Sequence, residues 1–401
     1  MDCLRGAPDE PAYSPSGDQA VAIVGGVADP QTGVALGELR MVRAVGVHGS
    51  SVEVELALAP AQVHARDALA DAIAGALADL DAVERVEVRF DSMTADEERA
   101  AAEALRLRQP EEPPYFSDGS TKVILVTSGK GGVGKSTVAV NIAQSLAAMG
   151  KQVGLLDGDV WGYSVPRMLG SEGEPVGIGD LLLPERVRGI KAVSIGFLTD
   201  ESSPVVWRGP MLHEAIQQFV SGVYWGKLDT LIVDLPPGTG DVPISLASLV
   251  PGANVVVVTT PQEVASRVAE RAGRMATRAK LRLIGVVENM SGFVCSHCGT
   301  PAEIFGESGG QSLADALGVP LLGRVPISAA LRAGADGGRP IFVEDPDDPA
   351  ARALEAISVE IDRRARAIVR RRITVPLFDG VHQEYPMERP AATAPSGGEH
   401  P

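Results

Sequence analysis

The fold of this chain is decided by one glycine-rich stretch, Gly129-Lys130-Gly131-Gly132-Val133-Gly134-Lys135-Ser136-Thr137. An apolar run, residues 123–128, precedes it, and a segment with the apolar spacing of a helix begins at Val138. The order is therefore strand, glycine-rich turn and helix, which is the context that a phosphate-binding loop requires. We predict that residues 129–137 bind the phosphates of a nucleotide.

Each residue type in this loop has a physical role in holding phosphate. Glycines let backbone N–H groups converge on phosphate oxygens without side-chain clashes, and the start of the helix adds a favourable dipole. Lys135 is placed to reach the terminal phosphates, and the hydroxyl of Ser136 is placed to bind Mg²⁺. We therefore expect a nucleotide and Mg²⁺ as ligands of this loop.

A second lysine, Lys130, lies near the start of the loop, where ordinary loops of this kind have no fixed residue. Only seven of the 36 basic residues in the chain are lysines, and two of the seven lie in this loop. Since arginine is otherwise the usual cation of the chain, a slim ammonium group is favoured at both places. The alternative is that Lys130 is a solvated loop charge.

The composition excludes several classes of protein. The net charge of −16 argues against a nucleic-acid-binding surface, which needs a basic patch. No apolar run reaches the length of about 18 residues that a membrane span needs, and the N-terminus lacks the layout of a signal peptide. Three cysteines give no disulfide framework, so we expect a reducing, cytoplasmic compartment.

The 401 residues divide into five predicted segments. These are a disordered N-terminus (1–18), a small α+β domain (19–91), a charged and then proline-rich linker (92–120), a large α/β domain (121–372) and a mobile tail (373–401). The large domain alternates apolar runs with helical patterns, which predicts a mainly parallel sheet covered by helices on both faces. After the strand that leads into the loop, further strands are predicted at residues 153–157, 231–234, 255–259, 283–287 and 319–323.

Ligands of such sheets bind at the carboxyl ends of the strands, and three aspartates stand there. Asp157 closes one strand and Asp159 follows it, so both are expected to face the phosphates; turn formation or helix capping is the alternative. Asp234 ends another apolar strand, where a buried acid needs a partner such as Mg²⁺. The segment 235–241 suits a loop that switches with the γ-phosphate, and its Asp241 is a further candidate.

Asn289 follows another predicted strand. Its side-chain amide offers donors and an acceptor, which suits the edge of an adenine ring. Turn formation is an equally good explanation from the residue type alone.

One pair of closely spaced cysteines, Cys295 and Cys298, lies in a segment that ends in glycine. The flanking residues predict a turn and not the helix N-terminus typical of a redox dithiol, and the expected compartment disfavours a disulfide. A zinc site, an iron–sulfur site or unliganded thiols remain. Such metal sites usually take four ligands, and the third cysteine, Cys3, lies in the predicted disordered terminus. Two thiolates per chain therefore suggest that two chains share one site.

The loop with its additional lysine resembles the deviant Walker A ATPases, which include MinD, the nitrogenase iron protein and the Mrp group. The resemblance implies ATP as the nucleotide, ATP hydrolysis as the activity, and a homodimer in which Lys130 touches the partner's nucleotide. Residues 157–166 and 235–241 look like the two switch segments of this group. Lys130 and Lys135 would then act in catalysis by neutralising charge on the transferring phosphoryl group.

The same resemblance implies roles for the polar residues at the strand ends. Asp159 would position or activate the attacking water, and Asp157 would help Asp234 to hold hydrated Mg²⁺. Asn289 would contact the nucleotide base.

The surroundings of the cysteine pair resemble one subgroup, the Mrp/ApbC-type iron–sulfur cluster carrier ATPases, over about residues 120–345. The resemblance is carried by the pair itself and by residues 288–293, 304–310 and 323–327. It implies a labile [4Fe–4S] cluster that bridges a homodimer through Cys295 and Cys298, slow ATP hydrolysis, and recipient apo iron–sulfur proteins as partners.

The small N-terminal domain resembles the domain fused to bacterial Mrp proteins and found in other iron–sulfur assembly factors. Residues 27–33 and the strands after them carry the resemblance. Relatives often have a cysteine in the loop after the second strand, where residues 59–64 of this chain include no thiol. We therefore expect a docking or regulatory role for this domain.

Two other functions are left open. One is a MinD- or ParA-like membrane or positioning ATPase with a structural zinc at the cysteine pair, whose basic segment 363–372 would contact anionic lipid. Such a run is more often a solvated helix face, so we expect no membrane partner. The other is a nucleotide-dependent scaffold in which the dimer state is the output.

Overall fold

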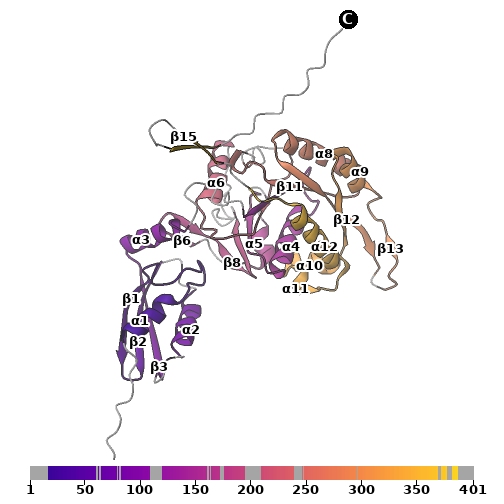
Figure 1. Ribbon diagram of the computed structural model, residues 1–401. Helices are drawn as coiled ribbons and strands as arrows, with labels where there is room; N and C mark the ends of the chain where they lie inside the picture. The colour runs from indigo at the N-terminus through magenta and orange to yellow at the C-terminus, as the bar shows by residue number, and fades with distance from the viewer. Residues whose placement is uncertain are drawn as a thin grey trace, which may run out of the picture.

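The computed structural model contains two domains, with the smaller N-terminal one at the lower left of Figure 1. It describes residues 17–59, 62, 65–78, 80, 83–108, 120–159, 162, 164–171, 176–194, 209–238, 246, 248–295, 297–368, 372–376 and 382–386. The predicted disordered terminus lies outside these residues except for Gly17 and Asp18, which begin a helix. Cys3 and Asp241 also lie outside them.

The N-terminal domain is built on a three-stranded sheet in the order β1-β2-β3. Its elements are α1 (Gly17–Gly26), β1 (Val42–His48), β2 (Ser51–Leu58), α2 (Arg66–Leu77) and β3 (Arg85–Ser92). β1 and β2 form an antiparallel hairpin, and β3 lies parallel to β2. The alternating apolar residues of β2 are buried, as the period of two in its sequence predicts.

A helix occupies part of the predicted linker. α3 (Ala95–Arg106) begins at Thr94, whose hydroxyl accepts a hydrogen bond from the Glu97 backbone while the Glu97 side chain accepts one from Thr94. This capping box gives hydrogen-bond partners to two backbone N–H groups at the start of the helix, and the apolar face with Leu105 packs into the N-terminal core. The expectation of a linker over all of residues 92–120 was therefore wrong for this part, because charged residues on the outer face hid a buried stripe.

The large domain contains a nine-stranded sheet in the order β13-β12-β11-β4-β10-β5-β9-β8, with β14 paired to β12. Its strands are β4 (Lys122–Ser128), β5 (Val153–Asp157), β8 (Glu185–Val187), β9 (Ile190–Ser194), β10 (Thr230–Asp234), β11 (Asn254–Thr259), β12 (Arg282–Val294), β13 (Pro301–Ala302) and β14 (Leu321–Ile327). Only β8 and β13 run antiparallel to their neighbours. The predicted strands are all present, and β12 extends seven residues further than expected, from Val287 to Val294.

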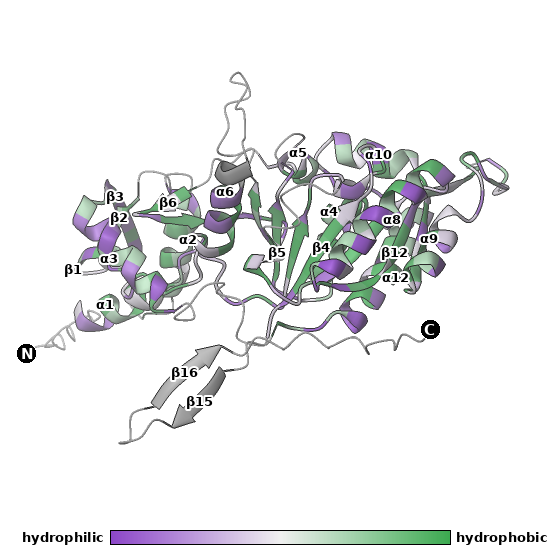
Figure 2. Ribbon diagram, turned by 90° about the horizontal axis from the view of Figure 1, so that it is seen from above, coloured by the Kyte–Doolittle hydropathy of each residue, from purple (hydrophilic) through white to green (hydrophobic). Residues whose placement is uncertain are grey.

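Helices cover both faces of this sheet. They are α4 (Lys135–Ala148), α5 (Val165–Leu169), α6 (Gly209–Ser221), α8 (Glu263–Arg278), α9 (Gly309–Leu317), α10 (Ala329–Asp336), α11 (Ile341–Glu344) and α12 (Pro349–Arg364). Figure 2 shows the apolar strands enclosed between these amphipathic helices. The predicted α/β fold with a mainly parallel sheet covered on both faces is confirmed.

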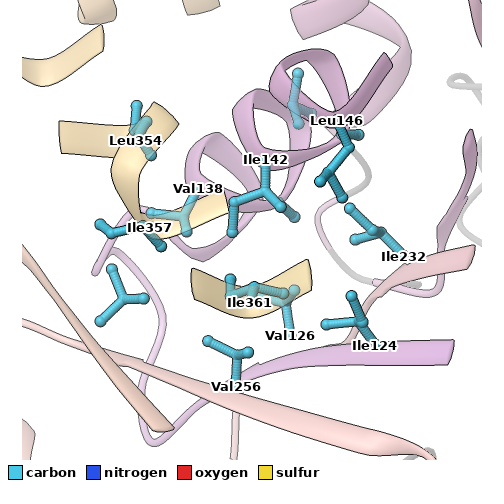
Figure 3. Packing of buried hydrophobic residues seen from close by; sticks show 14 of the residues in the cluster. Ile124, Val126, Val138, Ile142, Leu146, Ile232, Val256, Leu354, Ile357 and Ile361 are labelled. Carbon is cyan, nitrogen blue, oxygen red and sulfur yellow. The ribbon is translucent and has the colours of Figure 1, made fainter. Parts of the chain in front are cut away.

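The central strand β4 supplies both cores. Because successive side chains of a strand point to opposite faces, Val123 and Leu125 pack on the side of α6, α8 and α9, whereas Ile124 and Val126 pack under α4 and α12. Figure 3 shows this second core, in which Val138, Ile142 and Leu146 of α4 pack against β4 and β10. The spacing of four residues keeps these three side chains on one face of the helix, and their burial fixes α4 over the sheet.

A hairpin of the large domain completes the core of the small one. The hairpin consists of β6 (Val176–Ile178) and β7 (Leu181–Leu183). All four of its inward apolar side chains are buried in the N-terminal core, as is Tyr224. Ion pairing of Arg106 with Asp180 and a hydrogen bond from Arg186 Nε to the Gln31 carbonyl (2.7 Å) add polar contacts.

Two short strands fall within the predicted mobile tail and at its border. β15 (Arg372–Pro376) and β16 (His382–Pro386) pair with each other as an antiparallel hairpin. Among the described residues, no helix is long and apolar enough to cross a membrane.

Candidate nucleotide site and thiol turn

The glycine-rich loop lies between β4 and α4, as predicted. Gly132 and Gly134 adopt left-handed backbone angles, with φ of 77° and 79°, which non-glycine residues rarely tolerate. These two residues turn the chain so that α4 begins at Lys135 with its N-terminus facing a pocket. The pocket has a volume of about 230 Å³, and its lining includes most of the loop together with Asp159, Ser164 and Pro237.

Lys135 is held at the floor of this pocket by a carboxylate. Its Nζ donates to Asp234 Oδ1 at 2.6 Å and lies 3.6 Å from Asp159 Oδ2. Asp234 is fully buried at the carboxyl end of β10, and the Ser136 hydroxyl lies close to it. Burial raises the pKa of Asp234, whereas the ammonium of Lys135 opposes that rise. The ammonium of Lys135 is therefore held next to the position that the phosphates of a bound nucleotide would occupy.

Two carboxylate oxygens of the aspartates beside Lys135 are buried without a hydrogen-bond partner in the described part of the structure, Asp234 Oδ2 and Asp159 Oδ1. An unpaired buried carboxylate oxygen is costly, and a hard divalent cation is the partner that such oxygens favour. Ser136 supplies a hydroxyl oxygen next to Asp234. The donor set therefore fits Mg²⁺, which usually takes one or two carboxylates and completes its shell with water and phosphate.

Asp157 has a different environment, although it too is buried at a strand end. Its Oδ1 accepts from the Asp159 backbone at 3.1 Å, and its Oδ2 accepts from the Val165 backbone at 3.3 Å and from the Ser194 hydroxyl at 3.0 Å. Burial and the neighbouring Asp234 raise the pKa of Asp157 to about 7. In the structure Asp157 thus braces the turn that presents Asp159, and its role in holding hydrated Mg²⁺ stays a prediction.

Lys130 is partly exposed at the mouth of the loop. Its Nζ donates to Gln262 Oε1, at 3.2 Å, just before α8. It does not join Lys135 at Asp234 or Asp159, so the two lysines of the loop serve different places. A neutral amide is a weak anchor, which leaves the ammonium free to pair with an anion that approaches from outside.

Asn289 lies against the back of the loop. Its Nδ2 donates to the carbonyl of Val133 at 2.9 Å, and a Cβ added at Gly134 would overlap this same nitrogen. The side chain is 4% exposed. The structure therefore gives Asn289 a contact with the phosphate loop that the residue type alone did not predict, while contact with the base stays a prediction.

The cysteine pair lies at the tip of the hairpin formed by β12 and β13, well away from the body of the large domain (Figure 1). Two backbone bonds close the turn: Cys295 N donates to the Thr300 carbonyl at 3.0 Å, and Gly299 N donates to the Cys295 carbonyl at 2.8 Å. Gly299, with φ of 71°, allows this tight return. The predicted turn is confirmed, and it leaves Cys298 exposed to solvent and Cys295 partly buried.

The two thiols are free and close together. Cys295 is partly buried and Cys298 is exposed. Hydrogen bonding by the Thr300 side chain, 3.2 Å from Cys298 Sγ, and by Cys295 lowers the pKa of the Cys298 thiol. Among the described residues, no group of three or more His, Cys, Asp or Glu side chains is arranged to hold a metal ion. In this part of the chain the turn therefore offers two thiols and no complete metal site.

Sequence reasoning did not single out four residues that position these sites: Ser194, Gln262, Glu288 and Thr300. Glu288 carried a signal that could have been used, since it is an acid at the end of an apolar strand, as Asp234 is. Its carboxylate is 2% exposed and pairs with Arg324. The other three are common polar residues in loops or at element ends, and only their contacts identify them.

Comparisons with known protein families match both domains. A family model described as "NUBPL iron-transfer P-loop NTPase" matches residues 119–362. A second model, described as "Iron-sulfur cluster assembly protein", matches residues 18–89. These matches follow the division between the large and small domains of the structure.

Individual relatives agree with these matches. The chain is 43% identical over 351 residues to the "Iron-sulfur cluster carrier protein" of Mycobacterium leprae, covering 85% of this chain and 91% of the relative. It is 41% identical over 279 residues to the "Iron-sulfur cluster transfer protein NUBPL" of Mus musculus, covering 67% and 87%. A solved nucleotide-binding protein from Archaeoglobus fulgidus, in complex with ADP, is 37% identical with a TM-score of 0.50 and covers 57% of this chain and 90% of that one. The chain therefore belongs to the family of NUBPL-type iron-transfer P-loop NTPases.

Proposed function

We propose that this protein is an ATP-hydrolysing iron–sulfur cluster carrier, which binds a labile [4Fe–4S] cluster at a homodimer interface and transfers it to recipient apoproteins. The observation that carries the proposal is the turn of Cys295 and Cys298, two thiols short of a complete site, on a chain that also has a phosphate loop. Family membership supports it, because the relatives named above are called cluster carriers or cluster transfer proteins.

The nucleotide half of the function is assigned to the loop and its buried carboxylates. Backbone N–H groups of the loop and the α4 N-terminus would bind the phosphates, and Lys135 would turn from Asp234 toward the terminal phosphate. Ser136 and the free oxygen of Asp234 would hold Mg²⁺, which when bound neutralises charge on the transferring phosphoryl group. As Lys135 leaves, the cation would keep Asp234 from being an unpaired buried charge.

Asp159 is the group assigned to the attacking water. Its Oδ1 is buried and unpartnered among the described residues, and its side chain lines the pocket next to Lys135. A carboxylate in this position can accept a hydrogen bond from water and orient it in line with the scissile bond. Hydrolysis without further activation would be slow, in keeping with a carrier whose nucleotide state is a signal.

Lys130 is the residue assigned to the partner's nucleotide. It is partly exposed, its ammonium donates to the Gln262 amide, and among the described residues it forms no ion pair with the carboxylates of its own pocket. A second chain that placed its phosphates over this ammonium would complete each site from both protomers. The same dimer would bring together four thiolates, the usual number for an iron–sulfur cluster.

Cluster content tests the proposal. After anaerobic reconstitution we expect about four iron and four acid-labile sulfide per dimer, with a visible absorbance band. The Cys295→Ala and Cys298→Ala variants should lose both, whereas Cys3→Ala, a matched control outside the pair, should keep them. Cluster content that stays at the wild-type level in both pair variants would overturn the cluster site.

Mixed dimers test the shared nucleotide site. The Lys130→Ala and Asp159→Ala variants should each be inactive, yet their equal mixture should regain roughly a quarter of the wild-type ATPase rate, because half of the dimers are mixed and each carries one intact site. If Lys130 acts on the nucleotide of its own chain, no mixed dimer contains an intact site. A mixture as inactive as its components would therefore contradict the proposed dimer.

The alternative of a membrane or positioning ATPase with structural zinc is less well supported. The family model and the relatives named above refer to iron transfer or iron–sulfur clusters. Metal analysis of the anaerobically purified protein separates the two, since zinc without sulfide would favour the alternative. We place the carrier in the cytoplasm, where free thiols stay reduced, and assign its N-terminal domain a docking or regulatory role.

A further inference from the structure

One strand connects the nucleotide pocket with the thiol turn. β12 begins inside the parallel sheet, reaches the back of the phosphate loop at Asn289 and ends at Val294, directly before Cys295. At about 3.3 Å per residue, the six steps from Asn289 to Cys295 span about 20 Å at most. The two sites are thus joined by a short length of chain that is hydrogen-bonded at both ends.

The upstream stem of the thiol hairpin, which is β12, contacts the phosphate loop directly. Asn289 Nδ2 bonds to the Val133 carbonyl, and the space beside Gly134 is filled by this nitrogen and then by the Met290 side chain. Gly134 is the residue whose left-handed conformation starts α4. A change of the loop on binding phosphate would therefore press on Asn289 and Met290.

The downstream stem, which is the chain that runs from β13 to α9, contacts the same region near the phosphate loop. Glu288, next to Asn289, accepts a hydrogen bond from the backbone of Gly310 at 2.5 Å. Gly309 packs against Pro261, and its carbonyl accepts a hydrogen bond from the Ser266 hydroxyl. This fixes the N-terminus of α9, where the chain returns from the thiol hairpin. Residue 262, which follows Pro261, is the glutamine bonded to Lys130.

Between Asn289 and Cys295, β12 has a bulge. Met290 has a left-handed φ of 57°, rare for a residue with a side chain, and Gly292 has a φ of 132°. The register between β12 and β14 shifts between Asn289 and Phe293, so the ladder is interrupted there. A bulge re-aims the strand beyond it, and here it sets the direction of the hairpin that carries Cys295.

We propose that Glu288 and Asn289 are positioning residues that make the geometry of the Cys295–Cys298 turn depend on the nucleotide in the phosphate loop. The inference rests on the proposed function and assigns the route by which one site acts on the other. Movement of the loop shifts Asn289, the bulge at Met290 converts this shift into a reorientation of the hairpin, and Glu288 moves the returning stem with it.

Linkage between two ligands measures this coupling without any assay of cluster transfer. Co²⁺ serves as the thiolate probe, because its charge-transfer absorbance reports binding to Cys295 and Cys298. Its affinity is measured with the nucleotide-free protein and with protein saturated by a non-hydrolysable ATP analogue. We expect a difference of about five-fold or more in the wild type, and the same factor in the effect of Co²⁺ on analogue affinity, because coupling is reciprocal.

The variants separate positioning from simple structural support. In Asn289→Ala and Asn289→Asp the factor should fall to about one while Co²⁺ still binds through the thiols. Asn141→Asp is the matched control. Asn141 is also buried, donates to the Thr137 carbonyl of α4 and accepts from the Ile341 backbone, but in the described part of the structure it forms no hydrogen bond with β12. It should keep the wild-type factor. Glu288→Ala should reduce the factor, and Glu288→Gln, which retains an acceptor for Gly310, should restore it.

Each outcome is decisive. A wild-type factor of one, or an unchanged factor in both Asn289 variants, overturns the coupling route while leaving the cluster site intact. If the Asn289 variants fail to fold, Met290→Gly gives the answer, since relaxing the bulge should lower the factor without removing the Val133 contact. Co²⁺ binding that ignores the loss of both thiols would instead contradict the proposed function itself.

Discussion

The ammonium nitrogen of Lys135 lies 2.6 Å from Asp234 Oδ1, and both side chains are almost completely buried. The pair joins the first residue of α4 to the last residue of β10, across 99 positions of sequence. A buried ion pair of this kind contributes little net stability, but the loss of one partner leaves the other as an uncompensated charge.

Replacing Lys135 by methionine should therefore lower the free energy of unfolding by about 3–5 kcal/mol in the nucleotide-free protein. Nucleotide binding should also be lost, because the cation that faces the terminal phosphate is gone. Denaturant unfolding and calorimetric titration with ATP measure the two effects. The double variant Lys135→Met/Asp234→Asn should recover most of the stability and none of the binding; equal destabilisation in the single and double variants would contradict the charge argument.

The raised pKa of Asp157 predicts a pH dependence of stability. Burial and Asp234 raise this pKa to about 7 from an unfolded value of 3.8, so the folded state holds the proton more tightly. The resulting stability is fully present below the unfolded value and is lost as the pH rises through about 7. Unfolding of wild type and Asp157→Asn at pH 5 and pH 8 should show the variant gaining stability relative to wild type at the higher pH. A difference that stays constant with pH would contradict the assignment.

Two glycines of the phosphate loop allow a matched comparison. Gly132 and Gly134 both have left-handed φ, so alanine at either place should cost about 1 kcal/mol of stability. A Cβ at Gly132 would meet no atom within 4 Å, whereas one at Gly134 would overlap the Asn289 amide. Gly134→Ala should therefore be clearly more destabilising than Gly132→Ala in thermal unfolding. Equal losses would mean that Asn289 yields without cost.

The contact between the two domains can be tested on the β6–β7 hairpin. Ile178 is fully buried in the N-terminal core, while its neighbour Gly177 is exposed. Ile178→Asp would bury an unpaired charge and should release the small domain, seen as a larger radius of gyration in small-angle scattering. Gly177→Asp places the same charge on the outer face and should leave the radius unchanged. Unchanged scattering from Ile178→Asp would show that the domain is held elsewhere.

The strand, turn and helix around the phosphate loop could be predicted because their signals are local. The left-handed positions of the loop favour glycine. The apolar run before the loop is typical of a strand, and the four-residue apolar spacing after it is typical of a helix. The turn of Cys295 and Cys298 was predictable for the same reason. The helix α3 was not, because its buried stripe faces the β6–β7 hairpin, which lies far along the chain and comes close only after folding.

The sequence by itself determined that a nucleotide pocket and a two-thiol turn exist, since each is written in consecutive residues. Only the tertiary structure decided which buried oxygen holds Lys135, that Lys130 stands apart from it, and that Asn289 reaches the loop across 156 positions. The physical reason is that the partner of a charged or polar side chain is the group that lies next to it in the folded structure. Parallel strands, which are neighbours in the sheet but distant in sequence, bring those groups together at one edge.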